Sequence, residues 1–101
     1  MIDLIREKLP EIRLLCRRYN VRRLDLAGSA AKGEWREGSD LDFVVEFAPL
    51  PPGRRADAYF GLWFALEELC GRSVDLIEFE AITNPYLLES LVESKEELYA
   101  A

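Results

Sequence analysis

The sequence predicts a mixed domain of the α/β (α+β) class, a small mixed β-sheet with helices packed against it. Apolar runs of strand length alternate along the chain with helical patterns, and no repeat or low-complexity tract interrupts them. Half of the residues are hydrophobic, which is typical of a globular chain rather than a disordered one. A length of 101 residues allows one core but no separate substrate domain, so we expect a single domain over residues 1–101.

The first element is predicted to be a helix that ends near Asn20. Its apolar residues recur at helical spacing: Ile2, Ile5, Leu9, Ile12, Leu15, Cys16 and Tyr19. We expect Pro10 to kink this segment or to begin its second part, because proline lacks a backbone donor. A strand should then cover about residues 23–27, with a short helix after Ser29 and a loop over residues 35–39.

The second strand is predicted over residues 40–47, followed by a rigid proline-rich turn over residues 49–53. A helix should then occupy about residues 56–70 and end at Gly71. It carries an aromatic stripe wider than a small sheet should cover, which is made of Tyr59, Phe60, Trp63 and Phe64. Burial in the core is the favoured interpretation of this stripe, and contact with a partner is the alternative.

The third strand is predicted over residues 73–78, and a last helix should follow it. Asn84 and Pro85 match an N-cap and the first position of a helix, which we expect to run to about Ser94.

Two alternating carboxylates begin the second strand. Asp40 and Asp42 stand directly before the apolar residues 43–45. In a strand, residues two apart share one face and lie about 6.6 Å apart along the chain, so both acids should point to one place while Leu41 points into the core. Carboxylate pairs of this kind suit Mg²⁺, which is often held by one or two carboxylates together with substrate phosphates.

A Gly-Ser turn precedes these acids. Gly28 and Ser29 follow the first predicted strand, where free backbone N–H groups at the start of a helix form a place for phosphate oxygens. Lys32 could assist in holding a phosphate, although lysine lacks the two-pronged geometry of arginine. Gly-Ser pairs and Asp-x-Asp each occur widely outside active sites, so the hypothesis of a phosphate and metal site rests on their occurring together.

A third carboxylate, Asp75, interrupts the apolar run of the third strand. A charge within a strand is costly to bury unless it is paired or binds a metal, and the alternative is an acid on an edge strand that faces water. Three acids on neighbouring strands would match metal-assisted nucleotidyl transfer, in which two ions about 3.5–4 Å apart activate the attacking group and neutralise the leaving pyrophosphate.

In this order, Gly28-Ser29, ten residues, Asp40-x-Asp42 and later Asp75, the sequence resembles the minimal nucleotidyltransferase (MNT) branch of the DNA polymerase beta superfamily. The resemblance also covers the flanks, among them residues 21–24, 32–34, 45–47 and 84–87. It implies the nucleotidyltransferase fold. Lys32 departs from the pattern, since many members carry arginine there, and so does Ala30, where a larger or basic residue is common.

The resemblance implies a Mg²⁺-dependent enzyme with two ions per active site and ATP as substrate. Asp40, Asp42 and Asp75 would be the catalytic and metal-binding residues, and Gly28, Ser29 and Lys32 would bind the nucleotide. MNT proteins resemble antitoxins whose partner is a helical HEPN-domain RNase toxin, and family membership implies transfer of AMP to a tyrosine of that toxin. The alternative is an inactive module of the same fold that neutralises its partner by contact alone.

The charge of the chain narrows the classes of partner that it could bind. The net charge of −6 argues against a polymerase or a nucleic-acid partner, which would need a basic track. The charge is uneven, because residues 1–23 hold seven Lys and Arg against three acids, which leaves −10 for the remainder. A solvated helix face is the favoured interpretation of this basic segment, with an acidic partner or RNA as the alternative.

Several other chemistries are disfavoured. There is no histidine, and Cys16 and Cys70 lack metal-site spacing, so we expect both to be core thiols. No apolar run is long enough to span a membrane and no signal peptide is evident, so a cytoplasmic protein is expected. A P-loop is absent, and the acids precede the apolar strand, the reverse of haloacid-dehalogenase phosphatases. The nucleotide base, the acceptor and the oligomeric state, a homo-oligomer included, stay open.

Overall fold

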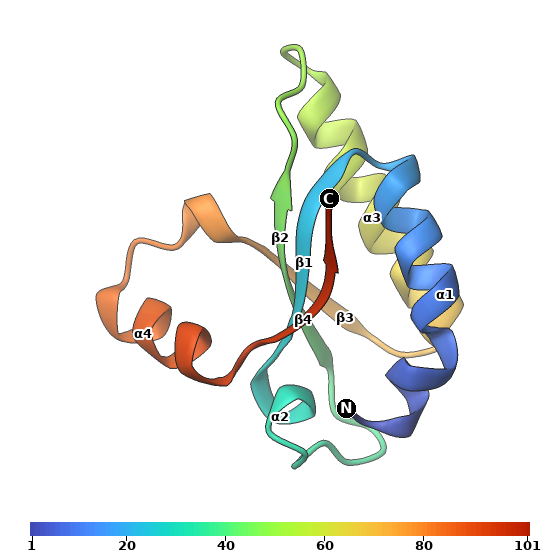
Figure 1. The fold of residues 1–101 in the computed structure, drawn as a ribbon, viewed down its shortest axis with the longest axis vertical. Helices are drawn as coiled ribbons and strands as arrows, with labels where there is room; N and C mark the ends of the chain where they lie inside the picture. Colours follow the sequence, from blue (N-terminus) through green and yellow to red (C-terminus); the bar gives the residue numbers. More distant parts are fainter.

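The computed structural model describes all 101 residues and confirms the predicted mixed class (Figure 1). The elements follow one another as α1 (Asp3–Arg18), β1 (Val21–Ala27), α2 (Gly28–Ala31), β2 (Leu41–Phe47), α3 (Arg54–Cys70), β3 (Val74–Glu78), the 3-10 helix η1 (Phe79–Ala81), α4 (Pro85–Ser94) and β4 (Glu96–Ala100).

The four strands form one mixed sheet in the order β3-β2-β1-β4. β1 pairs antiparallel with both β2 and β4, whereas β2 and β3 run parallel because α3 carries the chain back between them. β4 was not predicted. Its sequence shows no alternation of apolar and polar residues, and only Leu98 is deeply buried in this strand.

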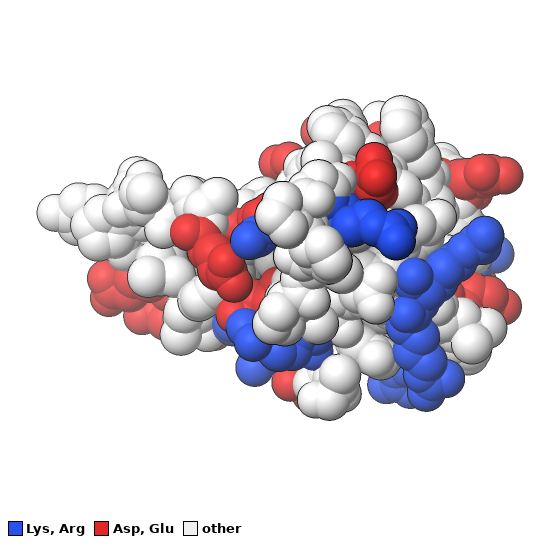
Figure 2. Space-filling model, turned by 90° about the horizontal axis from the view of Figure 1, so that it is seen from above, with Lys and Arg blue, Asp and Glu red and all other residues white.

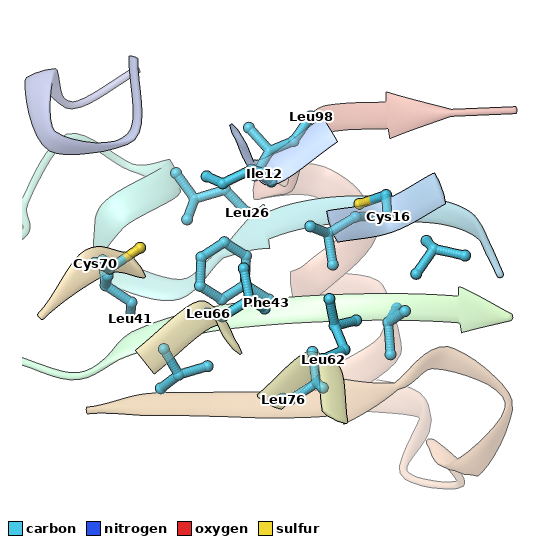
Figure 3. Packing of buried hydrophobic residues seen from close by; sticks show 14 of the residues in the cluster. Ile12, Cys16, Leu26, Leu41, Phe43, Leu62, Leu66, Cys70, Leu76 and Leu98 are labelled. Carbon is cyan, nitrogen blue, oxygen red and sulfur yellow. The ribbon is translucent and has the colours of Figure 1, made fainter. Parts of the chain in front are cut away.

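The main core lies between one face of the sheet and the helices α1 and α3 (Figure 3). Both helices direct apolar side chains onto alternate residues of the strands, which is the packing that amphipathic patterns predict. Cys16 and Cys70 belong to this core, as expected. α1 continues through Pro10 as one helix, and no helix of the chain is both long and apolar enough to cross a membrane.

Side chains of α3 cover the free edge of β3, an edge strand of the sheet. The Tyr59 hydroxyl donates to the carbonyl of Leu76 at 2.5 Å, and Trp63 Nε1 donates to the carbonyl of Val74 at 2.9 Å. The Val74 N–H donates in turn to the Glu67 carboxylate at 3.0 Å. Tyr59, Trp63 and Glu67 are four residues apart along α3, so one helix face occupies main-chain groups that would otherwise template pairing with another strand.

The rest of the aromatic stripe is not buried. Phe60 and Phe64 are 50% and 65% exposed, so the favoured interpretation of the stripe as core is wrong for these two residues. Tyr59 and Trp63 take the positions next to β3 and leave their neighbours on the outer flank of the helix. The Phe64 ring stacks on that of Trp63, with centroids 5.9 Å apart.

The opposite face of the sheet is covered only in part, by η1 and α4 (Figure 1). A small cluster of Ala27, Val44 and Leu91, with Phe79 and Ile82 against it, joins this lobe to β1 and β2. α4 begins as predicted, since the Asn84 side chain accepts from the second and third N–H groups of the helix and Pro85 follows it.

Candidate functional site

Two of the predicted acids are neighbours in the sheet. The parallel register of β2 and β3 places Asp42 beside Asp75, while Ala27, the last residue of β1, lies on the other side of Asp42. Adjacent strands are about 4.8 Å apart. Both carboxylates therefore share one end and one face of the sheet, the face that carries α4.

The third acid, Asp40, stands just outside the sheet. β2 begins at Leu41, one residue later than predicted, and the Asp40 side chain is exposed. Its charge still acts on its neighbour: burial, then Asp75, then Asp40 raise the pKa of Asp42 above its ordinary value. No group of three or more acidic, histidine or cysteine side chains is close enough to hold a metal ion in this structure.

The Gly-Ser turn lies directly against Asp42. Gly28 has a φ of +60°, and a β-carbon at this position would overlap Oδ2 of Asp42 and lie 3.1 Å from its Cγ. Only glycine combines this backbone angle with so close an approach. Ser29 is half-buried in the short helix α2, and the N–H of Lys32 closes that turn on the Gly28 carbonyl at 3.2 Å.

A cleft of about 190 Å³ connects these residues to α4. Its sheet side includes Asp42, Asp75, Gly28 and Lys32, so four of the six predicted site residues meet here. Its other wall is a helical stripe that the sequence analysis did not assign, formed by Leu87, Ser90, Leu91 and Ser94. The two leucines are four residues apart and so are the two serines, a spacing that places each pair on one face of a helix and could have indicated this stripe from the sequence.

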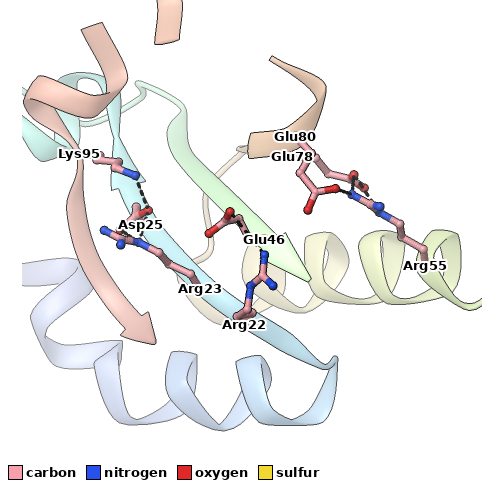
Figure 4. A network of polar contacts seen from close by, with 8 residues as sticks. All are labelled: Arg22, Arg23, Asp25, Glu46, Arg55, Glu78, Glu80 and Lys95. Carbon is pink, nitrogen blue, oxygen red and sulfur yellow. Dashed lines mark hydrogen bonds and ion pairs between the residues drawn. The ribbon is translucent and has the colours of Figure 1, made fainter. Parts of the chain in front are cut away.

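A buried ion cluster fixes the C-terminal end of α4 (Figure 4). Asp25 of β1 is only 2% exposed and accepts from Nε of Arg23 at 3.0 Å. Nζ of Lys95, directly after α4, lies 3.5 Å from the same carboxylate and 5.0 Å from the centre of the Phe79 ring. Sequence reasoning missed Asp25, although it is an acid within an apolar run, the signal that identified Asp75.

The electrostatics of the cleft suit a cation. Two carboxylates and one lysine line its sheet side, and burial, followed by the charges of Asp75 and Asp40, raises the pKa of Asp42. Oxygen ligands of this kind are those that Mg²⁺ prefers, and it completes its shell with water and phosphate oxygens. The donor set of Asp42 and Asp75 thus fits a hard divalent cation bound together with a phosphate.

The family described as "Nucleotidyltransferase domain" matches residues 9–98. The chain belongs to this family. The matched nucleotidyltransferase segment contains the turn, the acids, the cleft and nearly all of the sheet. The resemblance seen in the sequence is therefore confirmed, and so is the fold class.

Individual nucleotidyltransferases agree with this assignment. A Methanocaldococcus jannaschii protein named "Putative protein adenylyltransferase MJ0128" is 37% identical over 81 residues, which cover 80% of each chain. The solved "Structure of putative minimal nucleotidyltransferase" is 34% identical, with a TM-score of 0.77, and the match covers 94% of this chain and 95% of that one. The MNT and HEPN complex of Shewanella oneidensis, with a tri-AMPylated HEPN toxin, is 19% identical and shows the fold alone, with a TM-score of 0.67 over 95% of this chain and 72% of that one.

Proposed function

We propose that this nucleotidyltransferase transfers AMP from ATP to a protein hydroxyl, a tyrosine of a HEPN-domain toxin, and thereby acts as its antitoxin. The observation that carries the proposal is the register pair of Asp42 and Asp75 beside the Gly28 turn, in a cleft between the sheet and α4. The adenylyltransferase name of the 37% identical relative supports the reaction, and the AMP-modified toxin in the Shewanella complex supports the partner.

In the proposed reaction the acceptor oxygen attacks the α-phosphorus of ATP. The bond from that phosphorus to the bridging oxygen of pyrophosphate breaks, and the acceptor proton passes to Asp75. Asp40 and Asp42 would hold one Mg²⁺, and Asp42 with Asp75 would hold a second. The ions, when bound, supply charge neutralisation of the leaving pyrophosphate. The Gly28 backbone, the Ser29 hydroxyl and Lys32 hold the terminal phosphates.

The test combines purified protein, a HEPN-domain partner, Mg²⁺ and ATP, and follows the mass of the partner. We expect the wild type to add AMP to tyrosine and Asp42→Asn to lower the rate at least about 100-fold. Asp57→Asn is the matched control, because Asp57 is an exposed acid at the start of α3, outside the cleft. Transfer that survives Asp42→Asn would refute the assignment of this residue.

The second candidate is an antitoxin that acts by contact without catalysis. It is favoured by one observation, that no three ligands are close enough for a metal ion. In that case the wild type would block the toxin without any change in the mass of the partner. Asp42→Asn would then block the toxin as well as the wild type does.

A further inference from the structure

We infer that the outer side of α4, where Tyr86 and Leu87 adjoin the cleft and Glu89 and Glu93 flank them, is the docking surface for a basic, hydroxyl-bearing segment of the acceptor protein. The inference rests on the proposed function, since it names how the acceptor reaches the acids. Three observations on α4 and the cleft lead to it.

The first observation is exposed apolar surface that is continuous with the cleft. Tyr86 is 82% exposed and Leu87 is 43% exposed, and Leu87 also lines the cleft. Tyr86 precedes the cleft residue Ser90 by one helical turn, so its ring continues the cleft-side stripe outward. Tyrosine is one of the residue types that are enriched among the side chains that contribute most to binding at protein interfaces.

The second observation is the charge of this lobe. Both charged residues within α4 are acids, Glu89 and Glu93, and both are exposed. Lys95, the residue directly after α4, is already paired with Asp25. In Figure 2 the left end of the molecule, where Figure 1 has α4, shows red and white atoms, blue atoms lie where this end meets the rest, and a larger blue patch lies on the right. Arg55 pairs with Glu78 and Glu80 beside η1, which leaves Glu89 and Glu93 as the acids of α4 itself. Together with the acids of the cleft, this surface complements a basic segment and repels an acidic one.

The third observation is the size of the cleft. Its volume of about 190 Å³ is below the roughly 300 Å³ at which small-molecule sites begin. This chain alone therefore cannot enclose both a nucleotide and its acceptor. The missing wall belongs to the acceptor protein. α4 is fixed from beneath by Leu91 and the Lys95–Asp25 pair, so the surface is preformed.

The experiment measures the affinity of a HEPN-domain partner for the wild type and three variants by calorimetry. Tyr86→Ala and the double variant Glu89→Lys/Glu93→Lys should each weaken binding about 10-fold or more, and the charge reversal should weaken it most at low salt. Val92→Ala is the matched control: Val92 is 55% exposed on the flank of α4 away from the cleft, and its variant should bind within twofold of the wild type. All of these side chains are exposed, so circular dichroism should show unchanged folding.

Affinity for Mg²⁺-ATP separates this inference from the proposed function. All three variants should bind the nucleotide within twofold of the wild type, while Tyr86→Ala and the charge reversal bind the partner more weakly. If the partner affinities of the variants follow this pattern but the wild type transfers no AMP, the docking surface is supported and the proposed reaction is overturned. Equal partner affinity for all variants, or no partner binding by the wild type, would overturn the docking surface.

Discussion

Replacing Gly28 by alanine should disable the site more than it destabilises the fold. The left-handed φ of +60° costs an alanine about 1 kcal/mol. The added β-carbon also overlaps Oδ2 of Asp42, and relieving such a contact costs about 1–3 kcal/mol more. The carboxylate must move by on the order of 1 Å, a displacement that can lower a transfer rate about 100-fold. Thermal unfolding and the rate of AMP transfer to the partner measure the two effects.

Gly33 offers the matched control. It has a similar backbone angle, with a φ of +73°, but a β-carbon there would meet nothing within 4 Å. Gly33→Ala should therefore lose only the backbone term, about 1 kcal/mol or roughly 4–8 °C in Tm for a chain of this size, and keep its transfer rate. If Gly28→Ala retains as much activity as Gly33→Ala, the contact between Gly28 and Asp42 does not shape the site, and the reasoning fails.

Three further changes test the electrostatics, the thiols and the edge of the sheet. Burial and the charges of Asp75 and Asp40 raise the pKa of Asp42 in the folded chain. The folded chain therefore keeps a proton that the unfolded chain releases at lower pH, and the free energy of unfolding falls as pH rises from the unfolded pKa to the folded pKa. Asp42→Asn should raise Tm at pH 7 but not at pH 3, as calorimetry can show. An equal rise in Tm at both pH values would contradict the raised pKa of Asp42. Burial raises the pKa of Cys16 to about 12, so a thiol reagent at pH 8 should label it only after denaturation; rapid native labelling would refute its burial. Tyr59→Phe should lower the free energy of unfolding by about 1 kcal/mol in urea titrations, and an unchanged midpoint would show that water replaces the hydroxyl at the Leu76 carbonyl.

The parts of the fold that the sequence predicted are those in which local chemistry and tertiary structure agree. Asn and Pro are favoured at the N-cap and at the first position of a helix, and α4 starts with Asn84 and Pro85 in these positions. The acids beside apolar runs identified β2 and β3, and the register that unites Asp42 with Asp75 follows from the parallel crossover through α3.

What the sequence could not supply depends on distant partners. β4 exists because β1 offers it a free edge, and Phe60 and Phe64 are exposed because Tyr59 and Trp63 occupy the edge of β3. The α4 wall of the cleft has the same origin. Its residues line the cleft only because Leu91 packs against Ala27 and Val44 on the face of the sheet that carries Asp42. No local sequence pattern encodes this contact.

The arginines of the first 23 residues illustrate how position changes the meaning of charge. Nε of Arg13 donates to the carbonyl of Leu98 on the edge strand β4, and Arg22 approaches Glu46 at 3.8 Å. Arg23 compensates the buried Asp25, which in turn holds Lys95. Three of the seven basic residues of this segment thus stabilise the sheet and the anchor of α4, so these three have a structural role that needs no RNA partner. In the proposed docking, the acceptor protein meets the acidic and apolar side chains of the anchored α4 before its hydroxyl reaches Asp75.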